Sequence, residues 1–321
     1  MSNRTDLATN VTITSSYAGE SAQKFISAGL LSATTIEAGA ITVMPNVKYK
    51  SVIQRVETGS DLITAGSCDF TANSSVTLTE VIIQPSEFQV NMQLCTQTFL
   101  NSWESISMGL SAFNEIPATF SEYLIGHVMA KVAAQTESNI WQGNLGGAQA
   151  GEFDGLVTIA TADSAVLDVA GAAAGGLTSA NVIDEMQKAV DTIPNSLYNK
   201  QDLKLFISPE NARLYVRALG GFSATIGANG TDNRGTQWFN NDALSFSGVP
   251  VFVAMGMPSG YMMICETSNI FFGTGLLSDY NEVRTIDMAP VDGSQNFRLI
   301  ARFTAAVQIG VPADVVLYTP A

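Results

Sequence analysis

Few side chains in this 321-residue sequence are of the types that carry out acid–base or nucleophilic chemistry. The single histidine, His127, lies at the border of an apolar helical stripe, so we expect a packed structural histidine and not a general base. The closest carboxylates are Asp184 with Glu185 and Asp279 with Glu282, which a solvated helix face and a loop explain better than an acid/base pair. Gly-x-Ser-x-Gly, Walker, Gly-x-Gly-x-x-Gly and His-Glu-x-x-His motifs are all absent. We therefore predict no catalytic residues, no cofactor-binding residues and no enzymatic activity.

The residues that could ligate a metal are equally scattered. Cys68, Cys95 and Cys265 are odd in number and far apart in sequence, and no Cys-x-x-Cys occurs. The segment Asp232-Asn-Arg-Gly lacks the ligand spacing of a calcium loop. Neither a metal site nor a disulfide framework is predicted, and synthesis in a reducing cytoplasm is the best interpretation.

The lysines and the tryptophans can each be interpreted as functional or as structural residues. Lys48 and Lys50 could reach acidic partners or take part in a covalent cross-link, but solvated surface charge is the stronger expectation. Trp103, Trp141 and Trp238 are too far apart to indicate a stacking platform for nucleic acid, so we expect core or interface anchors.

The charge balance excludes one large class of function. Fifteen basic and 29 acidic side chains give a formal net charge of −14, which opposes tight binding of a phosphate backbone. Only 14% of the residues are charged and 46% are hydrophobic. This composition fits extensive association between subunits, although a monomer rich in Ser, Thr, Asn and Gln could have the same percentages. The polar N-terminus lacks the apolar core of a signal peptide, and no apolar run is long enough to cross a membrane.

The elements that would hold these residues are unusually long. Residues 297–311 place an apolar side chain at every second position, which predicts one strand far longer than the usual ~17–20 Å. Residues 119–143, with the capping box Thr119-Phe-Ser-Glu122, predict a helix of roughly 36 Å. Between residues 41 and 84, two β-like runs flank a polar tip and predict an extended hairpin, which is marginal in water unless it lies on a neighbour.

The second half of the sequence predicts an α/β region. One helix is expected from Thr178 or Ser179 to Pro194, with Val182, Ile183, Met186, Val190 and Ile193 buried. Another has Ser208 as N-cap and Gly220 just past its end. Residues 203–207, 249–253 and 261–265 indicate short buried strands, whereas 151–176 and 220–248 are expected to be loop-like.

In this order, the elements resemble the major capsid proteins of tailed bacteriophages with the Hong Kong 97-like fold. Each local match is weak, but together they cover nearly the whole chain. The segments that resemble the family are 77–95, the Glu-Phe-Asp-Gly-Leu sequence at 152–156, 206–215, 247–251 with Met257-Pro258, and 283–286 with 297–316.

The resemblance implies an α+β fold with five named parts and a function in assembly. We expect an N-terminal arm at 1–40, an E-loop hairpin at 41–84, a peripheral domain at 85–152 and 280–309 that contains a spine helix at 119–143, and an inserted α/β axial domain at 153–279 and 310–321. The implied function is self-assembly into pentamers and hexamers of an icosahedral head that encloses double-stranded DNA. Portal, scaffolding and decoration proteins are the implied further partners, without specific nucleic-acid binding, a cofactor or a membrane. The implied location is the virion, after synthesis in the bacterial cytoplasm.

Two family features have no counterpart here. No long, charged, helical scaffolding segment precedes the arm, so we expect a separate scaffolding protein or none, and no large N-terminal cleavage. Nothing matches the Lys, Asn and Glu of the family's cross-link, so no such site is assigned. An encapsulin-like cellular compartment, which shares the fold and holds enzyme cargo, is the main alternative. A soluble enzyme with an unrecognised site is a remote one.

Overall fold

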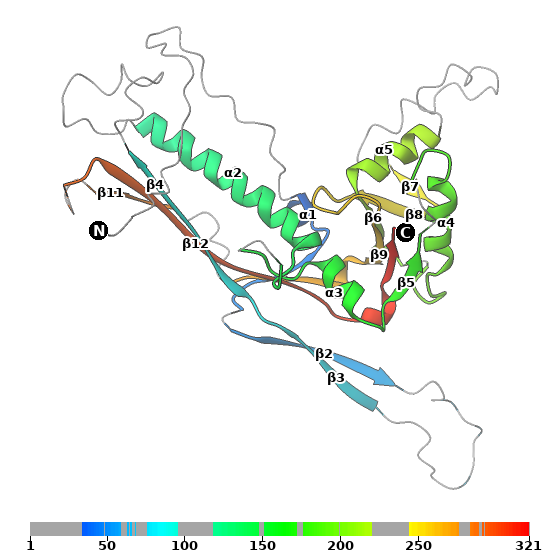
Figure 1. The fold of residues 1–321 in the computed structure, drawn as a ribbon. Coiled ribbons are helices and arrows are strands. Elements are labelled where there is room, and N and C mark those ends of the chain that lie inside the picture. The colour runs from blue at the N-terminus through cyan, green and yellow to red at the C-terminus, as the bar shows by residue number, and fades with distance from the viewer. Residues whose placement is uncertain are drawn as a thin grey trace. The chain divides into compact units, whose positions relative to one another are not determined.

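A computed structural model of the chain describes most of its regular elements (Figure 1). The described residues are 34–47, 49–58, 63, 65, 68, 76–95, 118–147, 151–171, 176–198, 200–219, 244–275, 283–288, 291 and 293–320. The chain divides into two compact units. One comprises residues 1–30, 87–132 and 277–303, and the other comprises 31–86, 133–276 and 304–321. Residues 1–33, which hold most of the predicted arm, lie outside the described residues.

The two long elements predicted from the sequence are present and each contributes to both units. Helix α2 spans Ala118–Gln142, within one residue of the prediction, although the side chains of its predicted capping box are outside the described set. Strand β12 spans Asn296–Ile309. Its alternating apolar row is buried at Phe297, Leu299 and Ala301, while Arg298 and Arg302 on the other row are exposed, so the predicted register is confirmed.

In the first unit, β12 pairs with two strands. β11 (Val283–Asp287) runs antiparallel to it, with Thr285 opposite Leu299, and β4 (Ser86–Cys95) pairs with it as well. The rings of Phe88 in β4 and Phe303 in β12 lie 5.6 Å apart between centroids. On the polar row, Arg298 Nε donates to Gln93 Oε1 at 3.0 Å. The apolar row of β12 thus contacts β4 through aromatic rings, and the polar row contacts it through a hydrogen bond.

The second unit is built on a six-stranded mixed sheet, in the order β5-β13-β9-β6-β8-β7. The strands predicted at 203–207, 249–253 and 261–265 are confirmed within one residue. The bounds are β5 Leu167–Ala170, β13 Val316–Thr319, β9 Met262–Glu266, β6 Leu203–Ile207, β8 Val249–Val253 and β7 Ser245–Phe246. Strand β13 pairs with β5 on one side and β9 on the other, so it is an interior strand of this sheet.

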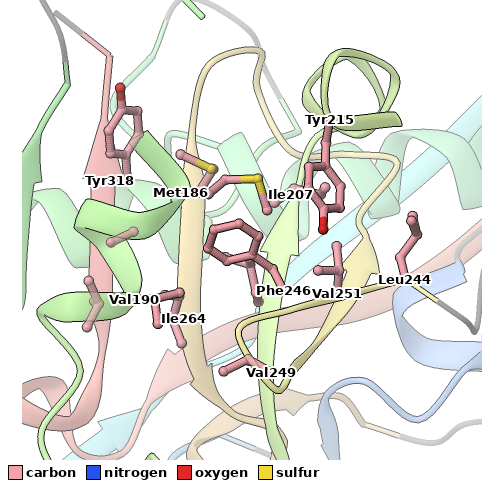
Figure 2. Close-up of a cluster of buried hydrophobic side chains, with 14 of the residues drawn as sticks. Met186, Val190, Ile207, Tyr215, Leu244, Phe246, Val249, Val251, Ile264 and Tyr318 are labelled. Atoms are coloured by element: carbon pink, nitrogen blue, oxygen red, sulfur yellow. The ribbon is translucent and has the colours of Figure 1, made fainter. Parts of the chain in front are cut away.

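Helices α4 (Val182–Asp191) and α5 (Pro209–Ala218) cover one face of this sheet. Figure 2 shows their shared core, in which Met186 and Val190 of α4 and Tyr215 of α5 meet residues of the strands. The ring of Tyr215 packs edge-on against Phe246 at 5.8 Å. Ser208 caps α5 as predicted, because its Oγ accepts from the backbone N–H of Asn211 at 3.2 Å.

The other face of the sheet is covered by the C-terminal part of α2. Phe206 projects to the side opposite Leu205 and Ile207, and its ring lies 5.2 Å from that of Trp141. Strand β9 is buried at four successive positions, Met262 to Cys265, as expected of a strand covered on both faces. Trp141 is therefore a core residue, as the sequence predicted.

Four expectations about this unit were wrong. The stretch 220–248 is not loop-like throughout, because β7 forms near its end and pairs with β8. The stretch 151–176 is not a continuous loop, because α3 (Leu156–Ala162) and β5 form within it. Helix α4 begins at Val182 instead of Thr178 or Ser179, since the Asn181 side chain accepts from the Thr178 N–H and holds the preceding residues in a turn. Ile183 is 37% exposed, because it lies about 100° around the helix from the buried Val182.

The remaining strands of the second unit join the far half of β12. β10 (Ile270–Gly273) runs antiparallel to it, with Phe272 opposite Val307, and β1 (Thr42–Met44) runs parallel to β10. A four-residue helix, α1 (Thr34–Glu37), precedes β1. Neither α1 nor β10 was predicted as an element, since both are too short to show a period.

Candidate assembly surfaces

The hairpin predicted between residues 41 and 84 is present as a two-stranded antiparallel ribbon over 51–58 and 76–83, whereas Thr42–Met44 pairs with β10 instead. β2 (Ser51–Thr58) and β3 (Val76–Ile83) pair over eight residues, with Val52 opposite Ile82 and Val56 opposite Leu78. The two strands form a sheet of their own and pair with no other described strand. Two strands alone bury little apolar surface, so a ribbon of this kind gains stability from whatever covers it.

One face of the ribbon is apolar and exposed. Because paired residues of an antiparallel ribbon share a face, alternate pairs line up along it. We call this face the ribbon face, and define it by five residues with their exposed fractions: Val52 46%, Val56 62%, Val76 63%, Leu78 65% and Ile82 47%. The pair Gln54–Glu80 lies among them. Five exposed apolar side chains on one face of a strand pair are typical of a protein interaction surface, even with one polar pair among them.

The base of the ribbon, in contrast, is anchored. Ile83, the last residue of β3, is 1% exposed, and it approaches Gly273 so closely that a Cβ at that glycine would lie 2.8 Å from Ile83 Cδ1. Gln308 of β12 donates its Nε2 to the carbonyl oxygen of Ile82 at 3.0 Å. The ribbon therefore leaves the second unit from a fixed base, with its apolar face bare beyond that base.

Within the part of the chain that the structure describes, the chemically capable residues singled out in the sequence do not come together. His127 is half-buried on α2. Glu185 is 3% exposed and binds two groups: Tyr318 Oη donates to its Oε2 at 2.9 Å, and Lys188 Nζ lies 2.7 Å from its Oε1. The solvated helix face expected for Asp184 and Glu185 is thus correct for Asp184 alone. Glu185 instead joins α4 to the C-terminal strand.

The lysine and cysteine predictions can be checked in part. Lys50 is exposed and its Nζ lies 5.5 Å from the centroid of the Tyr49 ring. Cys68 is exposed, Cys95 is half-buried and Cys265 is buried, and all three are free thiols. Burial raises the pKa of the Cys265 thiol far above its ordinary value, so this sulfur is poorly ionised. Residues Lys48, Trp103, Trp238, Asp232, Asp279 and Glu282 lie outside the described residues.

The described residues contain neither a metal-binding cluster nor a membrane-spanning helix. No group of three or more His, Cys, Asp and Glu side chains in this part of the chain could hold a metal ion. Among the same residues, no helix has both the length and the apolar character needed to cross a membrane.

Taken with its long strand and helix, this arrangement is the mixed helix and strand fold of phage capsid structures. Neither the family models nor the curated proteins contain a match to the sequence. Solved structures do match over nearly the whole chain. The capsid of a native GTA particle has a TM-score of 0.62 at 14% identity, covering 93% of this chain and 94% of that one. A structure from Mycobacterium phage Adephagia has a TM-score of 0.59 at 14% identity, with 93% and 94% covered.

A capsid structure from a third source agrees with the first two. That of the cyanophage P-SCSP1u has a TM-score of 0.54 at 12% identity and covers 97% of this chain and 93% of that one. The first and third of these neighbours are capsid structures, and the second comes from a phage. The sequence resemblance to phage capsid proteins is therefore confirmed at the level of the fold.

Proposed function

We propose that this chain is the major capsid protein of a tailed bacteriophage, with the Hong Kong 97-like fold, and that copies of it assemble into an icosahedral head around double-stranded DNA. The observation that carries the proposal is the match to capsid structures over 93% or more of the chain. A catalytic role would require a constellation of reactive groups, and the described residues offer single, structurally occupied ones such as Glu185.

The ribbon face supplies a physical basis for self-association. In a shell, each ribbon would lie on a neighbouring copy and bury the five residues of the ribbon face. Fully burying one Val, Leu or Ile side chain stabilises by about 1.5–3 kcal/mol. The five residues together expose about three side chains' worth of surface, so one ribbon would contribute roughly 4–8 kcal/mol before the entropic cost of association. Repeated over a closed shell, contacts of this size become strong through multivalency.

The domain boundaries drawn from the sequence fit this role and stay proposals. The axial domain, 153–279 with 310–321, would meet its copies around five-fold and six-fold axes, so forming pentamers and hexamers. The peripheral domain, 85–152 with 280–309, would make contacts between those clusters. The net charge of −14 suits an inner wall that does not adhere to packaged DNA. Portal, scaffolding and decoration proteins are the partners that such a head would need.

Size-exclusion chromatography followed by negative-stain microscopy tests the proposal. Expression of the chain, with a scaffolding protein if one is encoded beside it, should give closed particles tens of nanometres wide. Particles isolated from infected cells should contain nuclease-protected DNA. Particles that enclose a protein cargo instead would support the encapsulin-like alternative. A small discrete oligomer that turns over a substrate would overturn the shell function altogether.

A further inference from the structure

A buried carboxylate joins three segments that are far apart in the sequence. Glu137, in the C-terminal half of α2, is 0% exposed. The backbone N–H of Thr35 in α1 donates to its Oε2 at 3.1 Å, and the Thr35 hydroxyl donates to its Oε1 at 2.5 Å. The backbone N–H of Gly256, in the turn after β8, also favours the ionised form of this carboxylate.

The hydrogen bonds at this site form a closed set. Thr35 Oγ1 accepts from Trp141 Nε1 at 3.0 Å while it donates to Glu137, so neither the hydroxyl nor the indole is left unpaired. All the groups that act on the Glu137 carboxylate, those of Thr35, Trp141 and Gly256, are neutral. A buried carboxylate without a cation costs stability unless several donors converge on it, so the site depends on all three segments being in place.

Backbone packing at Gly256 provides independent support for this geometry. A Cβ at Gly256 would lie 2.0 Å from the carbonyl oxygen of Glu137 and 2.9 Å from the Cα of Ser138. The turn therefore approaches the backbone of α2 more closely than any residue other than glycine allows. The turn at Gly256 therefore packs directly on the residue whose carboxylate accepts from Thr35.

Helix α1 is too short to be stable without contacts to other elements. It has four residues, and an isolated helix of that length is unstable in water because nucleation is unfavourable. Thr35 is its one fully buried residue, and this residue carries both hydrogen bonds to Glu137. The position of α1 therefore depends on this contact.

We propose that Thr35, Glu137, Trp141 and Gly256 form a latch that holds α1 on α2, and that docking of α1 is energetically coupled to the turn at residues 254–257. When α1 leaves, the carboxylate loses both hydrogen bonds from Thr35 and becomes partly hydrated, and the Gly256 turn that packs on the same residue loses its dry surroundings. Opening at α1 must then weaken the turn, and the coupling acts equally in both directions. The proposal concerns the single subunit and does not require that the subunit forms a shell.

Hydrogen exchange of the full-length subunit, read by mass spectrometry, tests the latch. Thr35→Val keeps the shape of the side chain but removes the hydroxyl. Loss of a buried hydrogen bond to a charged group should speed exchange of residues 34–41 by about tenfold or more. Exchange of residues 254–257, which Thr35 is not seen to touch, should rise as well. Thr42→Val is the matched control, because Thr42 makes an exposed hydrogen bond to the Thr267 carbonyl at 3.0 Å, and it should change neither region.

A second variant keeps the test decisive. Glu137→Gln retains one acceptor oxygen and should raise exchange at both regions by a smaller factor than Thr35→Val. Unchanged exchange at 34–41 in both variants would show that α1 is held by other contacts. Faster exchange at 34–41 with none at 254–257 would remove the coupling. If both variants lose cooperative unfolding altogether, the cluster is an ordinary part of the core and the latch is refuted.

Discussion

Replacing two residues of the ribbon face with threonine should weaken assembly without unfolding the subunit. Val56 and Leu78 are cross-strand partners and are 62% and 65% exposed. Threonine keeps the preference for a strand but replaces apolar surface with a hydroxyl. Burying each of these side chains on a neighbour would contribute about two-thirds of the 1.5–3 kcal/mol of a fully exposed residue, so Val56→Thr with Leu78→Thr should cost roughly 2–4 kcal/mol per contact.

That loss corresponds to a roughly 30- to 700-fold weaker pairwise contact, since about 1.4 kcal/mol is a factor of ten. Sedimentation velocity over a range of subunit concentrations measures it as an increase in the concentration at which particles first form. The free energy of unfolding of the subunit should change by less than about 0.5 kcal/mol, because both sites are exposed within it. The conservative pair Val56→Ile with Leu78→Ile keeps the apolar surface and should assemble like the parent. Normal assembly of the threonine variant would mean that the ribbon face does not lie on a neighbour.

Three further results are expected. Phe303→Asp should destabilise the first unit by at least about 3 kcal/mol and abolish assembly. The reason is that it places a carboxylate against Phe88, whose ring centroid lies 5.6 Å from that of Phe303. Normal particles would show that this contact does not contribute to stability. In the native protein, a thiol reagent should modify the exposed Cys68 quickly and the buried Cys265 only after unfolding, and early labelling of Cys265 would contradict its burial. Burial raises the pKa of Glu137, so the folded state binds the proton of this carboxyl group more tightly than the unfolded chain does. The free energy of unfolding should therefore fall as pH rises through the raised pKa. Denaturant titrations at several pH values should show this dependence, and Glu137→Gln should flatten it.

The sequence predicted those elements of the fold that are long enough to show the periodic spacing of apolar residues typical of a helix or a strand. The 14-residue strand β12 and the 25-residue helix α2 are such elements, and both were placed within two residues. α1, α3 and β5 were missed because they have four, seven and four residues, and tertiary packing fixes them. Glu185 and Glu137 could not be recognised as buried, since each is satisfied by partners more than 100 positions away, Tyr318 and Thr35.

The sequence predicted the hairpin and the apolar row on one face of it, but it did not predict that this row is exposed. Val76-Thr-Leu-Thr alternates as a half-buried strand does, so an apolar row was legible. Alternation alone cannot say whether that row faces the core of its own chain or another molecule. The pairing register shows that the row does not face the core of this chain, because it puts Leu78 beside Val56, another exposed residue, and leaves Ile83 at the buried base.

The burial along β12 shows how a single strand can serve two units with different surroundings. From Phe297 to Arg302, buried and less buried residues alternate, as in a strand covered on one face. From Ala305 to Val307 three successive residues are buried, which requires cover on both faces. The two residues at this change are alanines, and small side chains are what two close faces leave room for. The change of pattern within an unbroken strand therefore marks where one structural environment gives way to the next, and it lies within three residues of the division between the two units at residue 303.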